Sequence, residues 1–182
     1  MLCKGIGVQE DRRAAFEWFM KASKQKHPKA LYYIGIYYYN GCDGVPRDHD
    51  KAREYFKKSA QLGVVDAMIS YAQLCQEKTK TSTNHQEIKS FQKASFDWYK
   101  KAAAQQHPTA LRELGRLYGA GIGTEKNDLL SAEYLKMAGD KQDPLATLLL
   151  GGYYENGRGG LPKDIHLALN CYLKAIQLGQ PT

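Results

Sequence analysis

A pattern of about 36 residues recurs along the chain, and this repetition constrains the fold more than any single motif does. An alanine marks each copy, and the steps between successive copies are 37, 43 and 36 residues: Ala30, Ala67, Ala110 and Ala146. A second series repeats with the same steps wherever the two overlap: Lys21, Lys58, Lys101, Met137 and Lys174. Such self-similarity is typical of a stacked array whose units cannot each bury a core alone.

Composition narrows the classes of protein that this array could form. Of the 182 residues, 43% are hydrophobic, which is enough for a continuous core. The formal net charge is +7, but acidic residues accompany the basic ones in every unit, which favours a solvated surface over a nucleic-acid footprint. No apolar run approaches the ~20 residues that a membrane helix needs.

Four cysteines are scattered without CxxC pairs or Cys/His spacing typical of metal ligands: Cys3, Cys42, Cys75 and Cys171. They indicate free thiols in a reducing compartment such as the cytoplasm, rather than a disulfide framework or a zinc site.

Each unit is predicted to contain a first helix (helix A), a glycine-bearing loop and a second helix (helix B). Equivalent positions in successive units form a column, and one column of helix A holds only small residues: Gly35, Ala72, Gly115 and Gly151. Because glycine inside a helix costs about 1 kcal/mol, this column predicts close approach to a neighbouring helix. Paired large residues of helix B are expected to pack against small ones: Trp18-Phe19, Tyr55-Phe56, Trp98-Tyr99, Tyr134-Leu135 and Cys171-Tyr172.

The ends of the helices are predicted by two further columns. Short polar side chains suited to capping helix B stand at Asp11, Asp48, Asn127 and Asp164. Prolines precede helix A at Pro28, Pro108, Pro144 and Pro181. The second full unit departs from the pattern, because Phe91 replaces the cap and the stretch 78–87 is an insertion. We therefore expect the cap of this unit to be missing or displaced. The polar composition of the insertion predicts a mobile loop.

The first full unit reads Ala30-x-x-x-Ile34-Gly35-x-x-Tyr38-x-x-Gly41, followed by Asp48-x-x-Lys51-Ala52-x-x-Tyr55-Phe56-x-Lys58-Ser59-Ala60. This pattern closely resembles the Sel1-like repeat family, which is related to tetratricopeptide repeats. The resemblance implies an all-α fold, an α/α right-handed superhelical solenoid of helix-turn-helix repeats with A helices on the concave side. It also implies a non-catalytic scaffold or adaptor that binds other proteins.

The repeats divide the chain into one predicted array over 1–182. We expect a partial repeat at 1–29, then repeats at 30–66, 67–109 with the inserted loop 78–87, 110–145 and 146–182. Because both ends fall at unit edges, we expect the array to be a segment of a longer solenoid.

No catalytic, cofactor or metal motif is apparent. The loop Gly119-Ala120-Gly121-Ile122-Gly123 resembles a phosphate loop, but no strand precedes it and the sister loops carry equivalent glycines. His27 and His107 recur at unit junctions and are therefore features of the repeat. We expect the chain not to be an enzyme.

A partner is expected on the stripe of helix A that the core columns leave uncovered, at positions i, i+4, i+7 and i+11. Its content varies between units, and tyrosine and arginine often anchor interfaces. The candidate residues are Lys29, Tyr33, Ile36, Gln73, Arg112, Glu113 and Arg116. The expected ligand is a protein or peptide, with no nucleic acid. A nucleic-acid-binding helical repeat and a purely architectural spacer remain alternatives.

Overall fold

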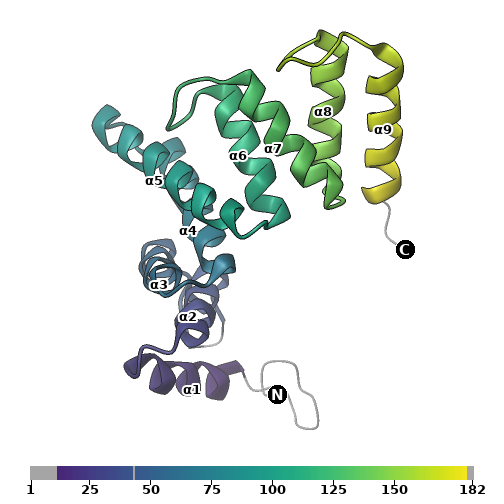
Figure 1. Cartoon of the computed structure of the whole chain (residues 1–182). Helices are drawn as coiled ribbons and strands as arrows, with labels where there is room; N and C mark the ends of the chain where they lie inside the picture. The colour runs from purple at the N-terminus through teal and green to yellow at the C-terminus, as the bar shows by residue number, and fades with distance from the viewer. Residues whose placement is uncertain (1–11, 43, 180–182) are drawn as a thin grey trace. The chain divides into compact units, whose positions relative to one another are not determined.

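The computed structural model describes residues 12–42 and 44–179, and these form nine α-helices (Figure 1). The helices are α1 (Arg12–Lys24), α2 (Pro28–Asn40), α3 (His49–Gln61), α4 (Val65–Thr81), α5 (His85–Ala104), α6 (Pro108–Ala120), α7 (Asp128–Asp140), α8 (Pro144–Asn156) and α9 (Ile165–Gly179). The extended structure in the described residues is a single bridge between Cys42 and Val45. The all-α repeat fold predicted from the sequence is therefore confirmed. The chain divides into two compact units, residues 1–75 and 76–182.

In the first unit, α2 packs against both α1 and α3. Ile34 of α2 and Ala52 of α3 are completely buried at its centre. Gly35 lies so close to the buried ring of Phe56 that a Cβ on this glycine would stand 2.5 Å from Phe56 Cε1. Close approach of the two helices therefore requires glycine here, as the column of small residues predicted.

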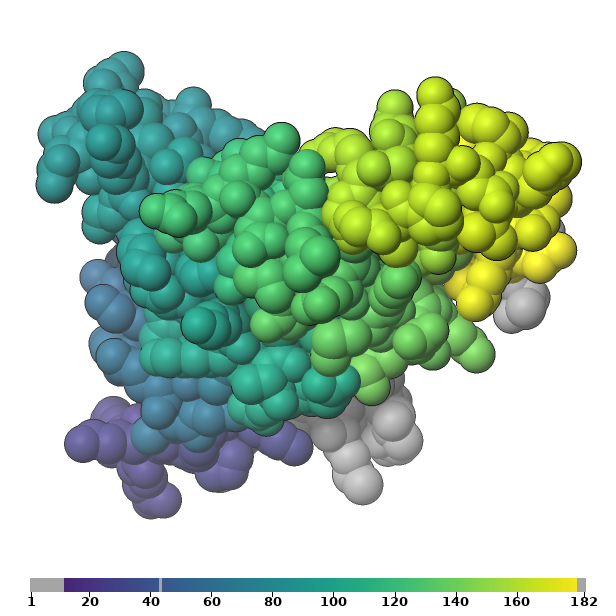
Figure 2. Space-filling model, turned by 45° about the horizontal axis from the view of Figure 1, so that its top comes forward, coloured from purple at the N-terminus to yellow at the C-terminus, as the bar shows by residue number. Residues whose placement is uncertain are grey.

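The second unit repeats the same arrangement in successive helix pairs. Helices α6 and α7 pack together, and so do α8 and α9. Helices α8 and α9 lie side by side in Figure 1, and their yellow-green and yellow residues adjoin in the space-filling view of Figure 2. Gly115 faces Leu135, and a Cβ on Gly151 would overlap the ring of Tyr172. The pairing of glycine with a large residue thus recurs in both units.

The capping column has the predicted role wherever it is described. Asp48 and Asn127 accept hydrogen bonds from Lys51 N (2.9 Å) and Leu130 N (3.0 Å), and Asp164 caps α9 in the same way. Asp11, Cys3 and Pro181 lie outside the described residues. In the unit with the insertion the cap is displaced to Asn84, which accepts from the amides of Gln86 and Glu87.

The loop predicted over 78–87 is wrong. Helix α4 continues to Thr81 and α5 begins at His85, so only residues 82–84 connect them. The polar residues here are compatible with a helix, because the Thr79 hydroxyl donates to the Gln76 carbonyl one turn back. The connection is closed by Ser82, whose hydroxyl donates to Glu87 Oε2 at 2.6 Å. The inserted residues therefore lengthen two helices.

The packing predicted for the large pairs is confirmed in part, because the second member is buried in three of the pairs while the first member is more exposed. Trp18 is 62% exposed, whereas Phe56, Tyr99 and Leu135 are buried. Adjacent positions on a helix are about 100° apart, so the two members of a pair are not covered equally. The first member still contacts helix A in two units, where Tyr55 stacks on Tyr38 and Tyr134 stacks on Tyr118. The first member is covered from outside by a lysine three residues later, with ammonium-to-ring distances of 4.5 Å for Lys21 over Trp18 and 4.1 Å for Lys101 over Trp98. These cation–π contacts account for the recurring lysine.

Burial predicts different reactivities for the cysteines. Cys75 is fully buried and burial raises the pKa of its thiol, whereas Cys42 and Cys171 are partly exposed. Since the thiolate is the reactive form, we expect Cys75 to react with a thiol reagent only after unfolding. The variant Cys75→Ser should therefore lose one slowly reacting thiol. Loss of a rapidly reacting thiol would contradict this assignment.

Candidate functional site

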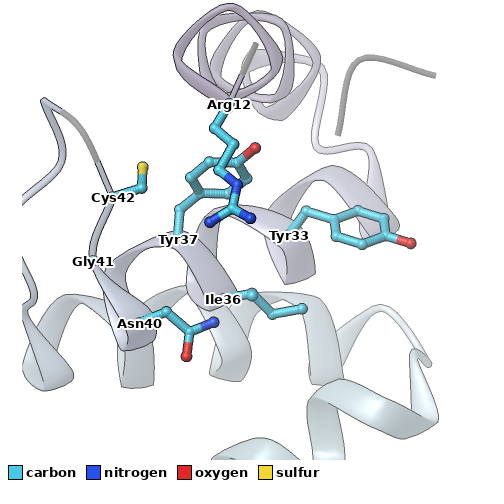
Figure 3. A pocket seen from close by; sticks show the side chains of 7 residues that line it. All are labelled: Arg12, Tyr33, Ile36, Tyr37, Asn40, Gly41 and Cys42. Carbon is cyan, nitrogen blue, oxygen red and sulfur yellow. The ribbon is translucent and has the colours of Figure 1, made fainter. Parts of the chain in front are cut away.

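Two of the residues predicted to bind a partner lie together in a hollow of the first unit. Tyr33 and Ile36 of α2 line a cavity of about 320 Å³, with Tyr37 and Asn40 of the same helix and Arg12 of α1 (Figure 3). Asn40 occupies position i+11 of the predicted stripe that begins at Lys29. Tyr37 is buried, and its ring also forms a wall of the cavity.

The aromatic side of this cavity is held in place by α1. The Tyr33 ring stacks on Phe19, with centroids 4.9 Å apart and an interplanar angle of 19°. Phe16 packs against Tyr37 in a tilted arrangement, with centroids 5.3 Å apart and an interplanar angle of 47°. Tyr33 nevertheless remains 42% exposed. The cavity thus presents a fixed, accessible aromatic surface, a chemistry suited to an apolar side chain of a ligand.

Polar groups stand at the edge of the same cavity. The Asn40 amide and the Arg12 guanidinium project beside Tyr37 in Figure 3. An amide both donates and accepts hydrogen bonds, so it matches the backbone of an extended peptide. The two other candidates of this unit, Lys29 and Gln73, are exposed but do not line the cavity.

The three candidates of the second unit form a network of ion pairs on α6. Glu113 accepts from Arg112 Nε at 3.2 Å and from Arg116 Nε at 3.0 Å. Arg112 also donates through Nη1 to Asp143 Oδ2 at 2.8 Å. Asp143 is the N-cap of α8, because its Oδ1 accepts from Ala146 N at 2.8 Å.

This network separates the three candidates by accessibility. The side chains of Arg112 and Glu113 are only 17% and 16% exposed, whereas that of Arg116 is 41% exposed. Arg112 joins α6 to the start of α8, so the structure gives it a packing role. The sequence prediction did not include Asp143. This residue stands at the same repeat position as His27 and His107, the N-cap position immediately before the proline that opens helix A.

The described residues contain no group of three or more His, Cys, Asp or Glu side chains placed to hold a metal ion. None of the helices within 12–42 and 44–179 is long and apolar enough to cross a membrane.

Stacked helix pairs, with an aromatic cavity and a charged helix face, define an all-α helical-repeat protein. The chain belongs to the Sel1 repeat family, whose model matches residues 1–27, 28–64, 89–107, 108–143 and 144–180. The resemblance predicted from the sequence is confirmed. The unmatched residues 65–88 contain α4 and its extension.

A solved structure shares this fold over nearly the whole chain. The Sel1 repeat protein from Oxalobacter formigenes is 28% identical, with a TM-score of 0.84 over 98% of this chain and 67% of that one. Among curated proteins, a chitin synthase regulator of Saccharomyces cerevisiae is 27% identical over 98% of this chain and 26% of its own length. An uncharacterized protein of Neisseria meningitidis serogroup B is 25% identical over 95% of this chain and 34% of its own length.

This chain therefore spans between about a quarter and a third of the length of these two curated relatives. Sel1 repeat proteins are generally protein–protein interaction scaffolds.

Proposed function

We propose that the chain is a non-catalytic scaffold or adaptor that binds a peptide segment of a protein partner along its A helices. The observation that supports this most is the cavity of the first unit, where Tyr33, Ile36 and Asn40 of the predicted stripe come together. Lys29 on α2 and Gln73 on α4 do not line this cavity, but they are exposed and would add polar contacts to the partner.

The cavity offers binding energy at low entropic cost. Tyr33 is already stacked on Phe19 and so loses little freedom when a ligand covers it. Burying one aliphatic side chain of the partner against Tyr33 and Ile36 contributes about 1.5–3 kcal/mol. In the second unit, Arg116 is the accessible candidate, while Arg112 and Glu113 hold its position through their ion pairs.

A similar role is suggested by one relative. The Saccharomyces cerevisiae protein is named as a regulator of chitin synthase, and such regulation acts on another protein. For this chain we propose only the corresponding class of activity, recognition of a protein.

Peptide selection tests the proposal without knowledge of the natural partner. A displayed random-peptide library is panned on the wild-type chain, and the affinity of selected peptides is measured by fluorescence polarisation. We expect Tyr33→Ala or Ile36→Ala to weaken binding about tenfold or more, because each removes an apolar anchor. Tyr33→Ala combined with Arg116→Glu should abolish binding while the melting temperature stays nearly unchanged.

Trp18→Ala is the matched control, because Trp18 is an exposed aromatic residue of the same unit that does not line the cavity. Peptides that bind Tyr33→Ala as tightly as the wild type, or that respond equally to Trp18→Ala, would show that the cavity is not the binding site.

A further inference from the structure

A second hollow, in the second unit, is lined mainly by hydrogen-bond donors. Its volume is about 230 Å³. It lies between the end of α4, the part of α5 around Gln92, and the end of α6. The lining residues are Gln76, Thr79, Lys80, Gln92, Arg116 and Ile122. We propose that this hollow binds a carboxylate group of the protein partner, an inference that rests on the proposed scaffold function.

The extra turn of α4 creates this hollow. The other A helices, α2, α6 and α8, have 13 residues each, whereas α4 has 17. Thr79 and Lys80 lie on the additional turn and have no counterparts in the other units. The insertion thus adds lining residues beside Arg116, the accessible candidate on α6.

One donor in this hollow is unsatisfied. Gln76 Nε2 is buried and has no hydrogen-bond partner among the described residues. Leaving a buried donor without an acceptor costs about 1–3 kcal/mol, which a bound oxygen would recover. The Thr79 hydroxyl donates its proton to the Gln76 backbone carbonyl, at 2.7 Å, and makes no hydrogen bond with Gln76 Nε2.

The charges favour a single negative group. No carboxylate lines the hollow, and Lys80 is exposed and forms no ion pair with the described residues. Arg116 shares Glu113 with Arg112, and Arg112 is paired in turn with Asp143. Three cations and two carboxylates leave one net positive charge, which matches a carboxylate better than a doubly charged phosphate.

The shape of the hollow fits the same ligand. Arg116 donates to Glu113 through Nε, and its terminal nitrogens form no hydrogen bond with the described residues, so a planar carboxylate can accept from the guanidinium. Gln92 adds an amide, and Ile122 supplies an apolar wall for the methylene groups that carry the carboxylate. An acidic side chain and the C-terminal carboxylate of a peptide both provide this chemistry.

Titration with small N-acetylated dipeptides, followed by nitrogen–proton correlation NMR of the chain, tests the inference. Ac-Ala-Glu-NH₂ presents a side-chain carboxylate, Ac-Ala-Leu-OH a terminal one, and Ac-Ala-Gln-NH₂ is the neutral control. We expect a saturable shift of the Gln76 side-chain amide with at least one carboxylate probe, and binding about tenfold weaker for the neutral one. The probe that binds tighter identifies the source of the carboxylate.

Variants locate the binding. Lys80→Met and Gln76→Met should each weaken the carboxylate probe about fivefold or more, while Lys89→Met, an exposed lysine on α5 that does not line the hollow, should not. Equal shifts from the neutral probe, tighter binding of inorganic phosphate, or loss in Lys89→Met would overturn the inference. Because Tyr33→Ala leaves this hollow intact, failure here is distinguishable from failure of the proposed scaffold function.

Discussion

Replacing Gly159 by alanine is expected to destabilise the second unit by about 3 kcal/mol, through backbone strain and overlap together. Gly159 has a φ of +63°, a left-handed conformation that is costly for any residue with a Cβ. A Cβ there would overlap the Asp128 carbonyl and stand 2.7 Å from Ala132 Cβ, because this loop rests on the first turn of α7. Urea unfolding followed by circular dichroism measures the loss.

Gly160 provides the matched control in the same loop. Its φ is +71°, but the nearest obstacle to a Cβ is the tip of the exposed Leu129 side chain at 3.3 Å. Gly160→Ala therefore carries the backbone strain without the overlap, and we expect a loss of about 1 kcal/mol. Equal losses in the two variants would show that the loop does not rest on α7 as described.

The second large effect is expected from Asp143→Ala, at about 4 kcal/mol. The substitution removes the cap of α8 and leaves Arg112, whose side chain is only 17% exposed, without its partner. Asp143→Asn should cost less, because an amide oxygen still accepts from Ala146 N. Combining Asp143→Ala with Arg112→Met should recover part of the loss, since the uncompensated charge is gone. Thermal and urea unfolding measure all three.

The ion pair between Arg158 and Asp128 is the control for this prediction. Its distance is similarly short, at 2.7 Å, and the hydrogen bond from Arg158 lowers the pKa of Asp128. The side chains are 42% and 30% exposed, however, so solvent screens the pair. We expect Arg158→Met to cost less than about 1 kcal/mol. A loss as large as that of Asp143→Ala would mean that exposure does not govern these pairs.

The fold was predictable because its determinants are local and repeated. Gly35, Gly115 and Gly151 recur at one helical position, and each faces a large side chain of helix B. Asp48 and Asn127 are similarly informative, since a cap bonds an amide only three residues away. The packing predicted for Trp18 was wrong, because this side chain is exposed. Periodicity places a side chain on one face of a helix but does not show how far the neighbouring helix covers it.

The candidate site was predictable only in part, because its contacts are distant in sequence. Tyr33 and Ile36 followed from one helix stripe, and the structure places both in one cavity. Arg112 was predicted to bind a partner, yet it is paired with Asp143, which lies 31 residues away in the sequence. The hollow at Gln76 was hidden for another reason, since a polar insertion gives the same composition whether it forms a loop or extends a helix.

The length of α4 has a consequence for how such arrays diversify. Four additional residues amount to just over one turn of 3.6 residues, so the helix continues with nearly the same angular phase. The additional residues of α4 and α5 lie at the ends of these helices that adjoin residues 82–84, so they add surface beyond the parts that correspond to the 13-residue helices of the other repeats. Lengthening helices at such ends would allow one repeat to acquire a binding specificity of its own without a compensating change elsewhere in the chain.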